Sequence, residues 1–344
     1  MTLYVLRYFP TLTETFVHDE IVALAQAGEA VSIAAFDARE PSRRPAPARV
    51  HAQPHRWRWY GWLGALLVEL TLRGGIRAFA MGIPARPALR VLWLSALLRE
   101  LGPDRVHVHF GGEAALWTML ACARVGVPFT VTVHAVDLFK PHPRLADVLA
   151  AAARVVTISD YNRRLLLERH ATVATVQRCR VAQAAESTRE PGRLLFVGRN
   201  VPKKGLDTLL AAVAGLPEGR SFTLDVVSDA ADPGIKGVRV HGLLSHAEVL
   251  ALIARAAVLV LPCRQAADGD MDGIPVVLLE ALAAGVAVIT TPISGIPEVI
   301  DEAVGWLVPP DDVEALRGAI QAALDDPGEV ARRGGEGRQR APTR

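Results

Sequence analysis

The chain has 344 residues, of which 51% are hydrophobic and 22% are charged. This length and composition suffice for two domains with buried cores and exclude an intrinsically disordered chain. A net charge of +2 at pH 7 argues against a dedicated nucleic-acid-binding protein. Cys122, Cys179 and Cys263 lie far apart and form no Cys-x-x-Cys motif, so we expect reduced thiols and neither a disulfide framework nor a zinc site.

The amino end shows no pattern typical of a secreted or membrane-spanning chain. Residues 1–25 are predicted to form a short strand and an amphipathic helix with acidic side chains, rather than a signal peptide. The nearest approach to a transmembrane segment, residues 59–68, is cut off by Glu69 and is too short to cross a bilayer. We therefore expect a cytoplasmic protein without a transmembrane helix.

Short apolar runs alternate with helical patterns along the whole chain. Strands are predicted at residues 2–8, 30–36, 105–110, 129–133, 154–158, 173–177, 193–198, 222–227, 237–241, 257–261, 286–290 and 305–308. Helices are predicted at residues 14–27, 61–72, 87–101, 113–125, 143–153, 160–169, 206–214, 246–254, 275–284 and 311–324. This alternation predicts an α/β fold of parallel sheets covered by helices, with strands buried on both faces.

A domain boundary is indicated by the polar, weakly periodic segment 180–192, which ends in Pro-Gly. We place an N-terminal domain at residues 1–185 and a similar C-terminal domain at 186–327. Two facing α/β domains leave a cleft, and ligands of such sheets bind beyond the carboxyl ends of the strands. The charged, Gly-rich end at 328–344 is predicted to be disordered.

Residues 39–105 are unusually basic, with twelve arginines against four acidic residues. Five tryptophans lie in this stretch or just beyond it, at positions 57, 59, 62, 93 and 117. Arginine beside tryptophan suits a membrane interface with anionic lipid, which predicts peripheral association with the inner face of the cell membrane. The alternative is a pair of ordinary packed helices with solvated arginines.

The segment DGIPVVLLEALAAG, residues 272–285, predicts a helix that starts near Pro275. A helix start offers free N–H groups and the positive end of the helix dipole, which suit a diphosphate. Asp272 precedes this start, and Glu280 lies about 7.5 Å along the axis from Pro275. A carboxylate accepts two hydrogen bonds from a vicinal diol, so Glu280 could hold a ribose and Asp272 the hydroxyls of a sugar. Taken alone, the pattern also fits a capping aspartate and a helix-face glutamate.

Two further strand-to-helix junctions lie in the same half of the chain. GRNVPKKG, residues 198–205, follows a predicted strand and supplies Arg199, Lys203 and Lys204. In a site without metal, such cations must neutralise the departing diphosphate of a nucleotide. SGIPE, residues 294–298, supplies backbone N–H groups and a glutamate. Three such junctions favour a nucleotide pocket over unrelated surface turns.

With these segments in view, the chain resembles a retaining glycosyltransferase of family 4. It is most similar to the bacterial colanic-acid or exopolysaccharide type of that family. The motifs that carry the resemblance are FPTLTETFVHDEIVAL (9–24), VHVHFGG (106–112), FTVTVHAVDLF (129–139), VTISDYN (156–162), VGRNVPKKGLD (197–207), LPCRQAADGDMDGIPVVLLEALAAG (261–285) and SGIPE (294–298). Together they imply the GT-B fold, in which two Rossmann-like domains face each other across a cleft. They specify the family but no particular sugar.

The resemblance assigns roles to individual residues. Asp272 and Glu280 match the family's pair of glutamates separated by seven residues, with aspartate in the first place here. The catalytic residues that it implies are His109, Arg199, Lys204 and Asp272. The donor-binding residues are Gly198, Arg199, Lys204, Asp272, Gly273, Ile274, Pro275, Glu280, Ser294, Gly295 and Glu298. On the acceptor side or in the cleft it points to Thr13, Glu14, His134, Tyr161 and Asn162, and Ser159 is expected to cap the helix that follows it.

The resemblance also implies a reaction. A hexose-type sugar would pass from a nucleotide diphosphate sugar to a glycan or lipid-linked acceptor in polysaccharide biosynthesis, with retained anomeric configuration. No cofactor or metal would take part, and the aspartates at 268–272 lack the glutamate that an EF-hand loop requires at its twelfth position. Relatives continue with a longer helix that returns to the amino domain, so looser domain closure is expected here.

Other classes of protein stay open. A nicotinamide dehydrogenase would need GxGxxG after the first strand, but residues 8–16 contain no glycine. A nucleotide-sugar epimerase of the same fold would share the diphosphate site and convert the donor without an acceptor. A nucleotide-sugar-binding protein or a truncated, inactive transferase would bind the donor without turning it over.

Overall fold

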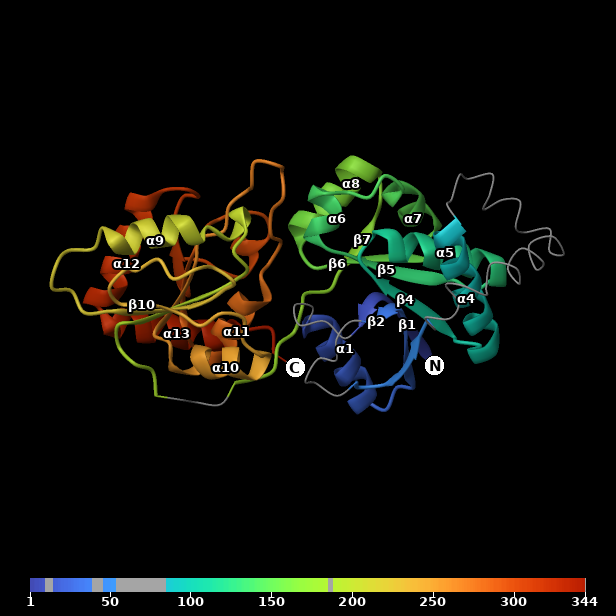
Figure 1. Ribbon diagram of the computed structural model, residues 1–344, viewed down its shortest axis with the longest axis horizontal. Helices are drawn as coiled ribbons and strands as arrows, with labels where there is room; N and C mark the ends of the chain where they lie inside the picture. The colour runs from blue at the N-terminus through green and yellow to red at the C-terminus, as the bar shows by residue number, and fades with distance from the viewer. Residues whose placement is uncertain (10–14, 39–45, 54–84, 185–187, 344) are drawn as a thin grey trace. The chain divides into compact units, whose positions relative to one another are not determined.

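The computed structural model describes residues 1–9, 15–38, 46–53, 85–184 and 188–343. Their contacts divide the chain into two compact units (Figure 1). The first comprises Met1–Thr157 and Arg163–Val176, and the second comprises Ile158–Asn162 and Gln177–Arg344. The sequence predicted one crossing between residues 185 and 186. The chain instead enters the second unit at Gln177, after a short excursion into it at Ile158–Asn162.

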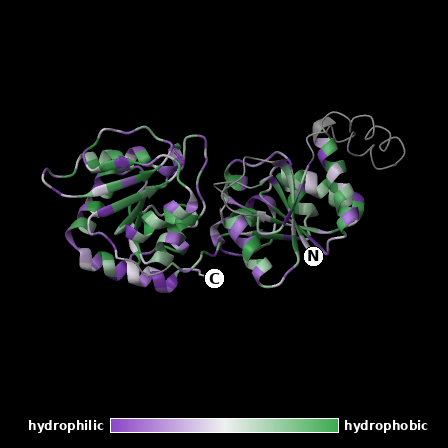
Figure 2. Ribbon diagram, turned by 60° about the horizontal axis from the view of Figure 1, so that its bottom comes forward, coloured by the Kyte–Doolittle hydropathy of each residue, from purple (hydrophilic) through white to green (hydrophobic). Residues whose placement is uncertain are grey.

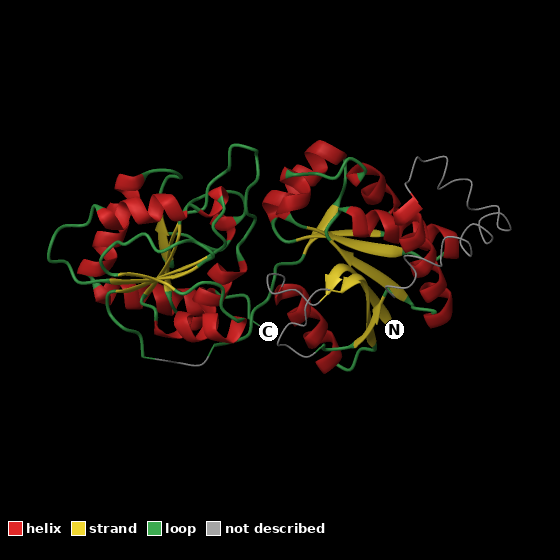
Figure 3. Cartoon of the chain, viewed as in Figure 1, coloured by secondary structure: helices red, strands yellow, loops and turns green. Residues whose placement is uncertain are grey.

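The first unit is built on a seven-stranded parallel sheet in the order β3-β2-β1-β4-β5-β6-β7. Figure 3 draws the strands in yellow and the helices in red. Its strands are β1 (Thr2–Phe9), β2 (Val31–Ala38), β3 (Arg49–Ala52), β4 (Arg105–His109), β5 (Phe129–Val133), β6 (Arg154–Thr157) and β7 (Ala174–Val176). Its helices are α1 (Thr15–Gln26), α4 (Ala85–Leu101), α5 (Glu113–Val125), α6 (Ala135–Phe139), α7 (Leu145–Ala151) and the part of α8 (Asp160–His170) that follows Asn162. The edge strand β3 and the short α6 are absent from the prediction, and the predicted helix at 61–72 lies outside the described residues.

Helices cover both faces of this sheet because its central strands are apolar on both sides. Leu3 and Val5 of β1 are fully buried with Val108 of β4 in a core that includes α4 and α5. The intervening Tyr4 and Leu6 point the other way, into a smaller core with α1. The ribbon coloured by hydropathy shows the same concentration of apolar residues on the strands (Figure 2). Doubly covered parallel strands are the arrangement that the continuous apolar runs predicted.

Part of the Arg- and Trp-rich stretch lies in this core. Trp93 of α4 and Trp117 of α5 are both buried and both pack edge-on against Phe36. The guanidinium of Arg90 lies over the Trp117 ring at 4.3 Å and pairs with Asp37 at 2.9 Å. These residues therefore follow the packed-helix alternative, whereas tryptophans 57, 59 and 62 lie outside the described residues. Within the described ranges, no helix has the length and apolarity needed to cross a membrane.

The second unit contains a six-stranded parallel sheet in the order β10-β9-β8-β11-β12-β13. Its strands are β8 (Arg193–Val197), β9 (Thr223–Val227), β10 (Val238–Val240), β11 (Val258–Leu261), β12 (Ala287–Thr290) and β13 (Gly305–Leu307). Its helices are α9 (Leu206–Ala214), α10 (His246–Arg255), α11 (Val276–Ala284), α12 (Val313–Asp325) and α13 (Pro327–Arg340), with the short 3-10 turns η2 (Pro202–Lys204) and η3 (Ile296–Glu298). Phe196, Leu259 and Ile289 of these strands are fully buried in the core of this unit.

The prediction of a disordered end at 328–344 is wrong, because most of this segment forms α13. Asp326 caps the helix by accepting from the N–H of Glu329 at 2.9 Å. The glycines that suggested flexibility serve close packing: a Cβ at Gly334 would lie 2.1 Å from the carbonyl oxygen of Gly285, and one at Gly337 would lie 2.7 Å from Leu282. Because these glycines are three residues apart, they share one helix face, which packs on α11 and β12.

Candidate active site

Three loops of the second unit leave neighbouring strands at one edge of the sheet. β8, β11 and β12 are adjacent and parallel, so the segments that follow them emerge at the same edge. The first segment contains η2, the second leads into α11, and the third contains η3. The strand order therefore brings together the three junctions that the sequence analysis singled out.

Glycine allows two of these loops to touch. Gly205 follows η2 with φ of 66°, and a Cβ there would lie 2.0 Å from the carbonyl oxygen of Pro262 in the next loop. That distance is impossible for any other residue, and the left-handed backbone adds to the strain. A Cβ at Gly198 would likewise press on the methylenes of Lys204, at 3.3 Å. The backbone thus sets Lys204 beside the loop that carries Asp272.

The charged side chains of these two loops form a largely buried cluster. Lys204 Nζ lies 2.7 Å from Asp272 Oδ2. Lys203 Nζ lies 3.3 Å from Asp272 Oδ1 and 3.1 Å from Asp270 Oδ1. Arg199 is exposed at the end of β8, and its side chain makes no hydrogen bond or ion pair with the described residues. Two ammonium groups and two carboxylates therefore meet at the carboxyl ends of β8 and β11.

Burial and charge oppose each other in this cluster. Burial acts to raise the pKa of Asp272, but the charges of Lys204 and Lys203 outweigh it and hold the pKa below its ordinary value. Burial acts to lower the pKa of Lys204, and the charge of Asp272 outweighs it and raises the pKa. Cys263, whose pKa burial raises to about 12, stays a thiol 3.8 Å from Asp272. The mutual attraction of Lys204 and Asp272 thus favours the charged form of both side chains.

The segment after Asp272 forms the start of α11. Gly273, Ile274 and Pro275 are buried, and the helix begins at Val276. Pro275 is therefore the residue before the helix rather than part of its first turn, a shift of one position from the prediction. The N–H groups at the helix start and the Asp272 carboxylate lie next to each other in the chain, as a site for a phosphate beside a sugar requires.

Glu280 meets a histidine that the sequence analysis did not select. Glu280 is buried, and its Oε1 lies 2.6 Å from Nε2 of His246. His246 is the first residue of α10, whose start is fixed by a capping box between Ser245 and Glu248. The sequence contains the capping pattern Ser-x-x-Glu, but no local signal points from His246 to a residue 34 positions away.

The third loop is tied to the short segment at 158–162. Glu298 accepts hydrogen bonds from the N–H groups of Asp160 at 2.9 Å and Tyr161 at 2.7 Å, and from Arg178 at 2.7 Å. These contacts satisfy the first turn of α8, so Glu298 acts as an acceptor for a helix start. Ser159 accepts from the N–H of Asn162 at 3.1 Å, which confirms the predicted cap.

Close approach explains the small residues in the third loop. A Cβ at Gly295 would lie 2.8 Å from that of Ser159, so the loop and the start of α8 pack backbone to backbone. The preceding Ser294 has φ of 51°, a left-handed conformation that non-glycine residues rarely adopt. Strain of this kind is retained where the surrounding structure fixes it.

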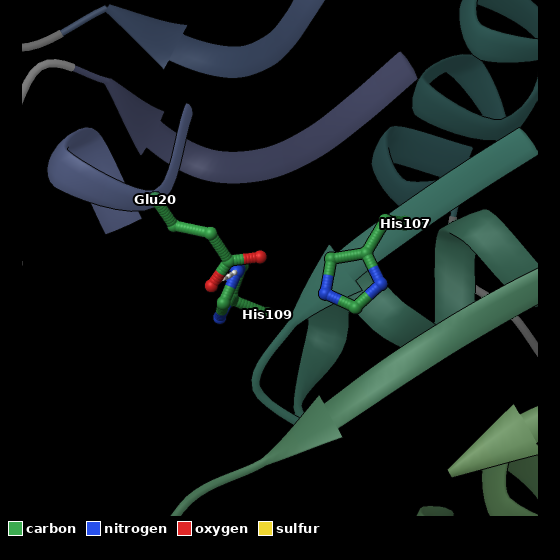
Figure 4. Close-up of side chains that lie close together, drawn as sticks. All are labelled: Glu20, His107 and His109. Carbon is green, nitrogen blue, oxygen red and sulfur yellow. Dashed lines mark ion pairs between the residues drawn. The ribbon is translucent and has the colours of Figure 1, made fainter. Parts of the chain in front are cut away.

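The first unit contains a second cluster, around His109 at the end of β4. Figure 4 shows Glu20 of α1 pointing toward His109, with His107 beside them. Glu20 Oε2 lies 3.6 Å from His109 Nε2, and its Oε1 accepts a hydrogen bond from the Tyr4 hydroxyl at 2.7 Å. His109 Nδ1 lies 3.2 Å from His134 Nε2. The structure thus brings together the predicted His109 and His134 and adds Glu20 and Tyr4. Thr13 and Glu14 lie outside the described residues.

Burial and contacts with neighbouring side chains shift several pKa values in this second cluster. Burial lowers the pKa of His107 to about 3 and holds that of His134 well below its ordinary value. Burial acts to raise the pKa of Glu20, but its contact with His109 and the other neighbours lower the pKa to about 2. Glu20, His107 and His109 are residue types that bind metals, and their ligand atoms lie within 4.8 Å of one another. Both ring nitrogens of His107 are already bonded, however, to Thr130 at 2.7 Å and to Thr132 at 3.1 Å.

Comparisons with known proteins fit this arrangement. Residues 13–181 match the family model described as "Glycosyltransferase Family 4", and residues 191–326 match the one described as "Glycosyl transferases group 1". This chain belongs to the family 4 glycosyltransferases. The two matched segments contain His109 and the three loops of the second unit, respectively. The predicted family and enzyme class are therefore confirmed.

Two relatives align with most of this glycosyltransferase. The amylovoran biosynthesis glycosyltransferase AmsK of Erwinia amylovora is 27% identical over 90% of this chain and 86% of its own. The 2-deoxystreptamine glucosyltransferase of Streptomyces kanamyceticus is 28% identical over 77% of this chain and 81% of its own. Among solved structures, HepE of Anabaena in complex with UDP and glucose has a TM-score of 0.73 at 15% identity, over 99% of this chain and 94% of its own. The two parallel sheets thus confirm the predicted GT-B fold.

Proposed function

We propose that this glycosyltransferase moves a hexose-type sugar from a nucleotide diphosphate sugar to a glycan or lipid-linked acceptor in exopolysaccharide biosynthesis. We propose further that transfer retains the anomeric configuration and needs neither a metal nor a cofactor. The alignment with a protein named for amylovoran biosynthesis supports the acceptor class. The UDP and glucose bound by HepE, which shares the fold, support the donor class.

The observation that carries the proposal is the largely buried cluster at the ends of β8 and β11, which consists of Lys203, Lys204 and Asp272. Lysine side chains are rarely buried unless they are paired, so two of them at one sheet edge indicate a site for negative charge. A diphosphate would replace Asp272 as the partner of the Lys204 ammonium, which is already largely removed from water, and would free Asp272 to accept hydrogen bonds from sugar hydroxyls. As the sugar–phosphate bond breaks, Lys204 and Arg199 would stabilise the growing negative charge.

The other predicted donor residues have consistent places in this proposal. The turn Gly273–Pro275 and the start of α11 would face the diphosphate with N–H groups. Glu280 would accept from the ribose diol, five residues into the helix counted from Pro275. Ser294 and Gly295 would offer backbone groups, and Glu298 would support them by fixing the loop. His109 would contact the donor sugar, with His134, Tyr161 and Asn162 on the acceptor side.

A donor panel tests the proposal. The purified protein is incubated with UDP-, GDP-, ADP- and dTDP-sugars, with and without a bacterial lipid extract, and release of the nucleotide diphosphate is followed. We expect release from one donor, enhanced by the extract and abolished in an Asp272→Ala, Glu280→Ala double variant. Asp325→Ala, which removes an exposed ion pair with Arg220, is the matched control and should keep full activity. Donor binding without release, or release that survives in the double variant, would contradict the proposal.

We also propose that the enzyme acts in the cytoplasm at the inner face of the membrane, on the grounds of its basic residues 39–105. Flotation with liposomes that contain anionic lipid tests this. The protein should float at low salt and be released as the salt concentration rises, because the attraction is electrostatic. Failure to float at low salt would count against membrane association and leave the transfer reaction untouched.

A further inference from the structure

The pair of His246 and Glu280 carries an inference about donor selection, which rests on the proposed function. We propose that His246 is a positioning residue that holds the Glu280 carboxylate for the ribose diol and so makes the enzyme select ribonucleotide over 2′-deoxyribonucleotide donors. The starting observation is the contact of 2.6 Å between His246 Nε2 and Glu280 Oε1. Nothing in the sequence between the two residues predicts this contact.

The geometry of the pair is fixed from both sides. The two side chains are 14% and 9% exposed, so little water competes for their hydrogen bond. The start of α10 is held by the capping box of Ser245 and Glu248, and α11 is buried along most of its length. α10 packs on α11. Two anchored helices therefore hold the imidazole against the carboxylate, and the glutamate is ordered before a donor binds.

The chemistry of the pair assigns each oxygen a task. An ionised carboxylate only accepts hydrogen bonds, so Nε2 of His246 is the donor. This contact is made to Oε1, and Oε2 is the oxygen that we assign to the ribose. A ribose presents two adjacent hydroxyls, whereas a 2′-deoxyribose presents one. A site built to bond a hydroxyl discriminates against the ligand that lacks it, because a buried polar group is then left without a partner.

A second histidine–carboxylate pair in the same unit provides the comparison. His241 Nε2 lies 2.7 Å from Asp225 Oδ1, nearly the same length as the pair of His246 and Glu280. Asp225 is 1% exposed, and its other oxygen is bonded to Arg193 at 2.7 Å. Both oxygens of Asp225 thus have partners within the unit, which is the arrangement of a structural pair. His241→Ala is therefore a matched control for His246→Ala.

Calorimetric titration of the full chain tests the inference. UDP, GDP, ADP and dTDP are titrated into the wild type, and the ribonucleotide that binds is then compared with its 2′-deoxy counterpart. The wild type should bind the ribonucleotide about tenfold more tightly, as loss of one hydrogen bond to a charged group predicts. His246→Ala should weaken the ribonucleotide about tenfold and leave the deoxyribonucleotide within about twofold, which removes the selectivity. His246→Gln, which keeps an N–H donor, should retain part of it, and His241→Ala should retain all of it.

The outcomes separate the inference from the function on which it rests. If the wild type binds dTDP, a 2′-deoxyribonucleotide, but none of UDP, GDP and ADP, the inference alone is overturned. If it binds none of the four, the proposed function fails and the inference falls with it. If the wild type binds but does not distinguish ribose from deoxyribose, Glu280 does not read the diol and the inference alone is overturned. Equal weakening of both nucleotides in His246→Ala would show a merely structural role, which also overturns it. Unchanged melting temperatures of the variants show that each comparison concerns a folded protein.

Discussion

Gly334 and Gly335 are neighbours in α13, and substitution of each by alanine should have opposite effects. Gly334 faces the protein, where a Cβ would lie 2.1 Å from the carbonyl oxygen of Gly285 and 3.0 Å from its carbon. These are backbone atoms between a helix and a strand, so they cannot rotate away. A Cβ at Gly335 would meet no atom within 4 Å. Neither glycine has a left-handed backbone, so alanine brings no strain of that kind.

The magnitudes follow from these surroundings. Alanine in a helix interior is more stable than glycine by roughly 0.5–1 kcal/mol, a gain that both variants share. At Gly335 nothing opposes it, so Gly335→Ala should stabilise the protein by that amount. At Gly334 the helix must move off the underlying turn, and overpacking of this kind costs about 1–3 kcal/mol or more. The two variants should therefore differ by about 1–3 kcal/mol, with Gly334→Ala the less stable.

Thermal unfolding followed by calorimetry measures the difference. In a unit of this size, 1 kcal/mol corresponds to about 2–4 °C in Tm. We expect Gly335→Ala to melt about 1–4 °C above the wild type, and Gly334→Ala to melt below the wild type. If Gly334→Ala were as stable as Gly335→Ala, α13 would not pack through this face, and the close contact with Gly285 would be refuted.

Three further variants test other parts of the structure. Glu20 has a pKa of about 2 in the folded protein against an ordinary value of 4.5, so its contribution to stability is complete above pH 4.5 and is lost as the pH falls toward 2. Glu20→Gln should therefore remove roughly 3 kcal/mol of the acid dependence of the unfolding free energy, measured by unfolding at a series of pH values. An unchanged acid dependence would contradict the contact with His109. Glu298→Ala should lower the free energy of unfolding in urea by about 1–3 kcal/mol, because two helix N–H groups and Arg178 lose their acceptor. An unchanged free energy of unfolding would show that these hydrogen bonds do not form in solution. Lys204→Met should lower kcat by about 100-fold or more because the departing diphosphate loses a largely buried cation. Substitution of the exposed Lys236 by Met should leave kcat unchanged. Equal rates for the two variants would show that Lys204 does not stabilise the departing diphosphate.

The periodic parts of the fold were predictable, and so was the grouping of the donor loops. Apolar runs located every strand except β3, an edge strand whose four residues include none that is buried. The loops after β8, β11 and β12 were singled out by composition, and the sheet order places those strands side by side. Local signals suffice here because strand burial and helix starts are encoded within a few residues.

Contacts between distant segments could not be predicted in the same way. The glycines of α13 predict a flexible tail until the opposing Gly285 is known, because only the neighbour turns a helix-weakening residue into a packing requirement. The partners of Glu280 and His109 are His246 and Glu20, and each pair is joined by the tertiary fold alone. Glu298 was assigned to the donor by its motif, and the structure adds that it holds the start of α8. Side-chain partners of this kind follow from helix placement, which one sequence does not display.

In the proposed reaction, a sugar leaves a nucleotide diphosphate for a separate acceptor without help from a metal. Donors labelled in the sugar should therefore be incubated with the enzyme, a bacterial lipid and glycan extract, and EDTA, and the label should be followed into the acceptor fraction. We expect that one donor transfers its label, that EDTA leaves the rate unchanged, and that the new linkage keeps the donor's anomeric configuration. Conversion of the donor to an isomeric nucleotide sugar without an acceptor would contradict the claim and indicate an epimerase, and transfer that EDTA abolishes would overturn metal independence.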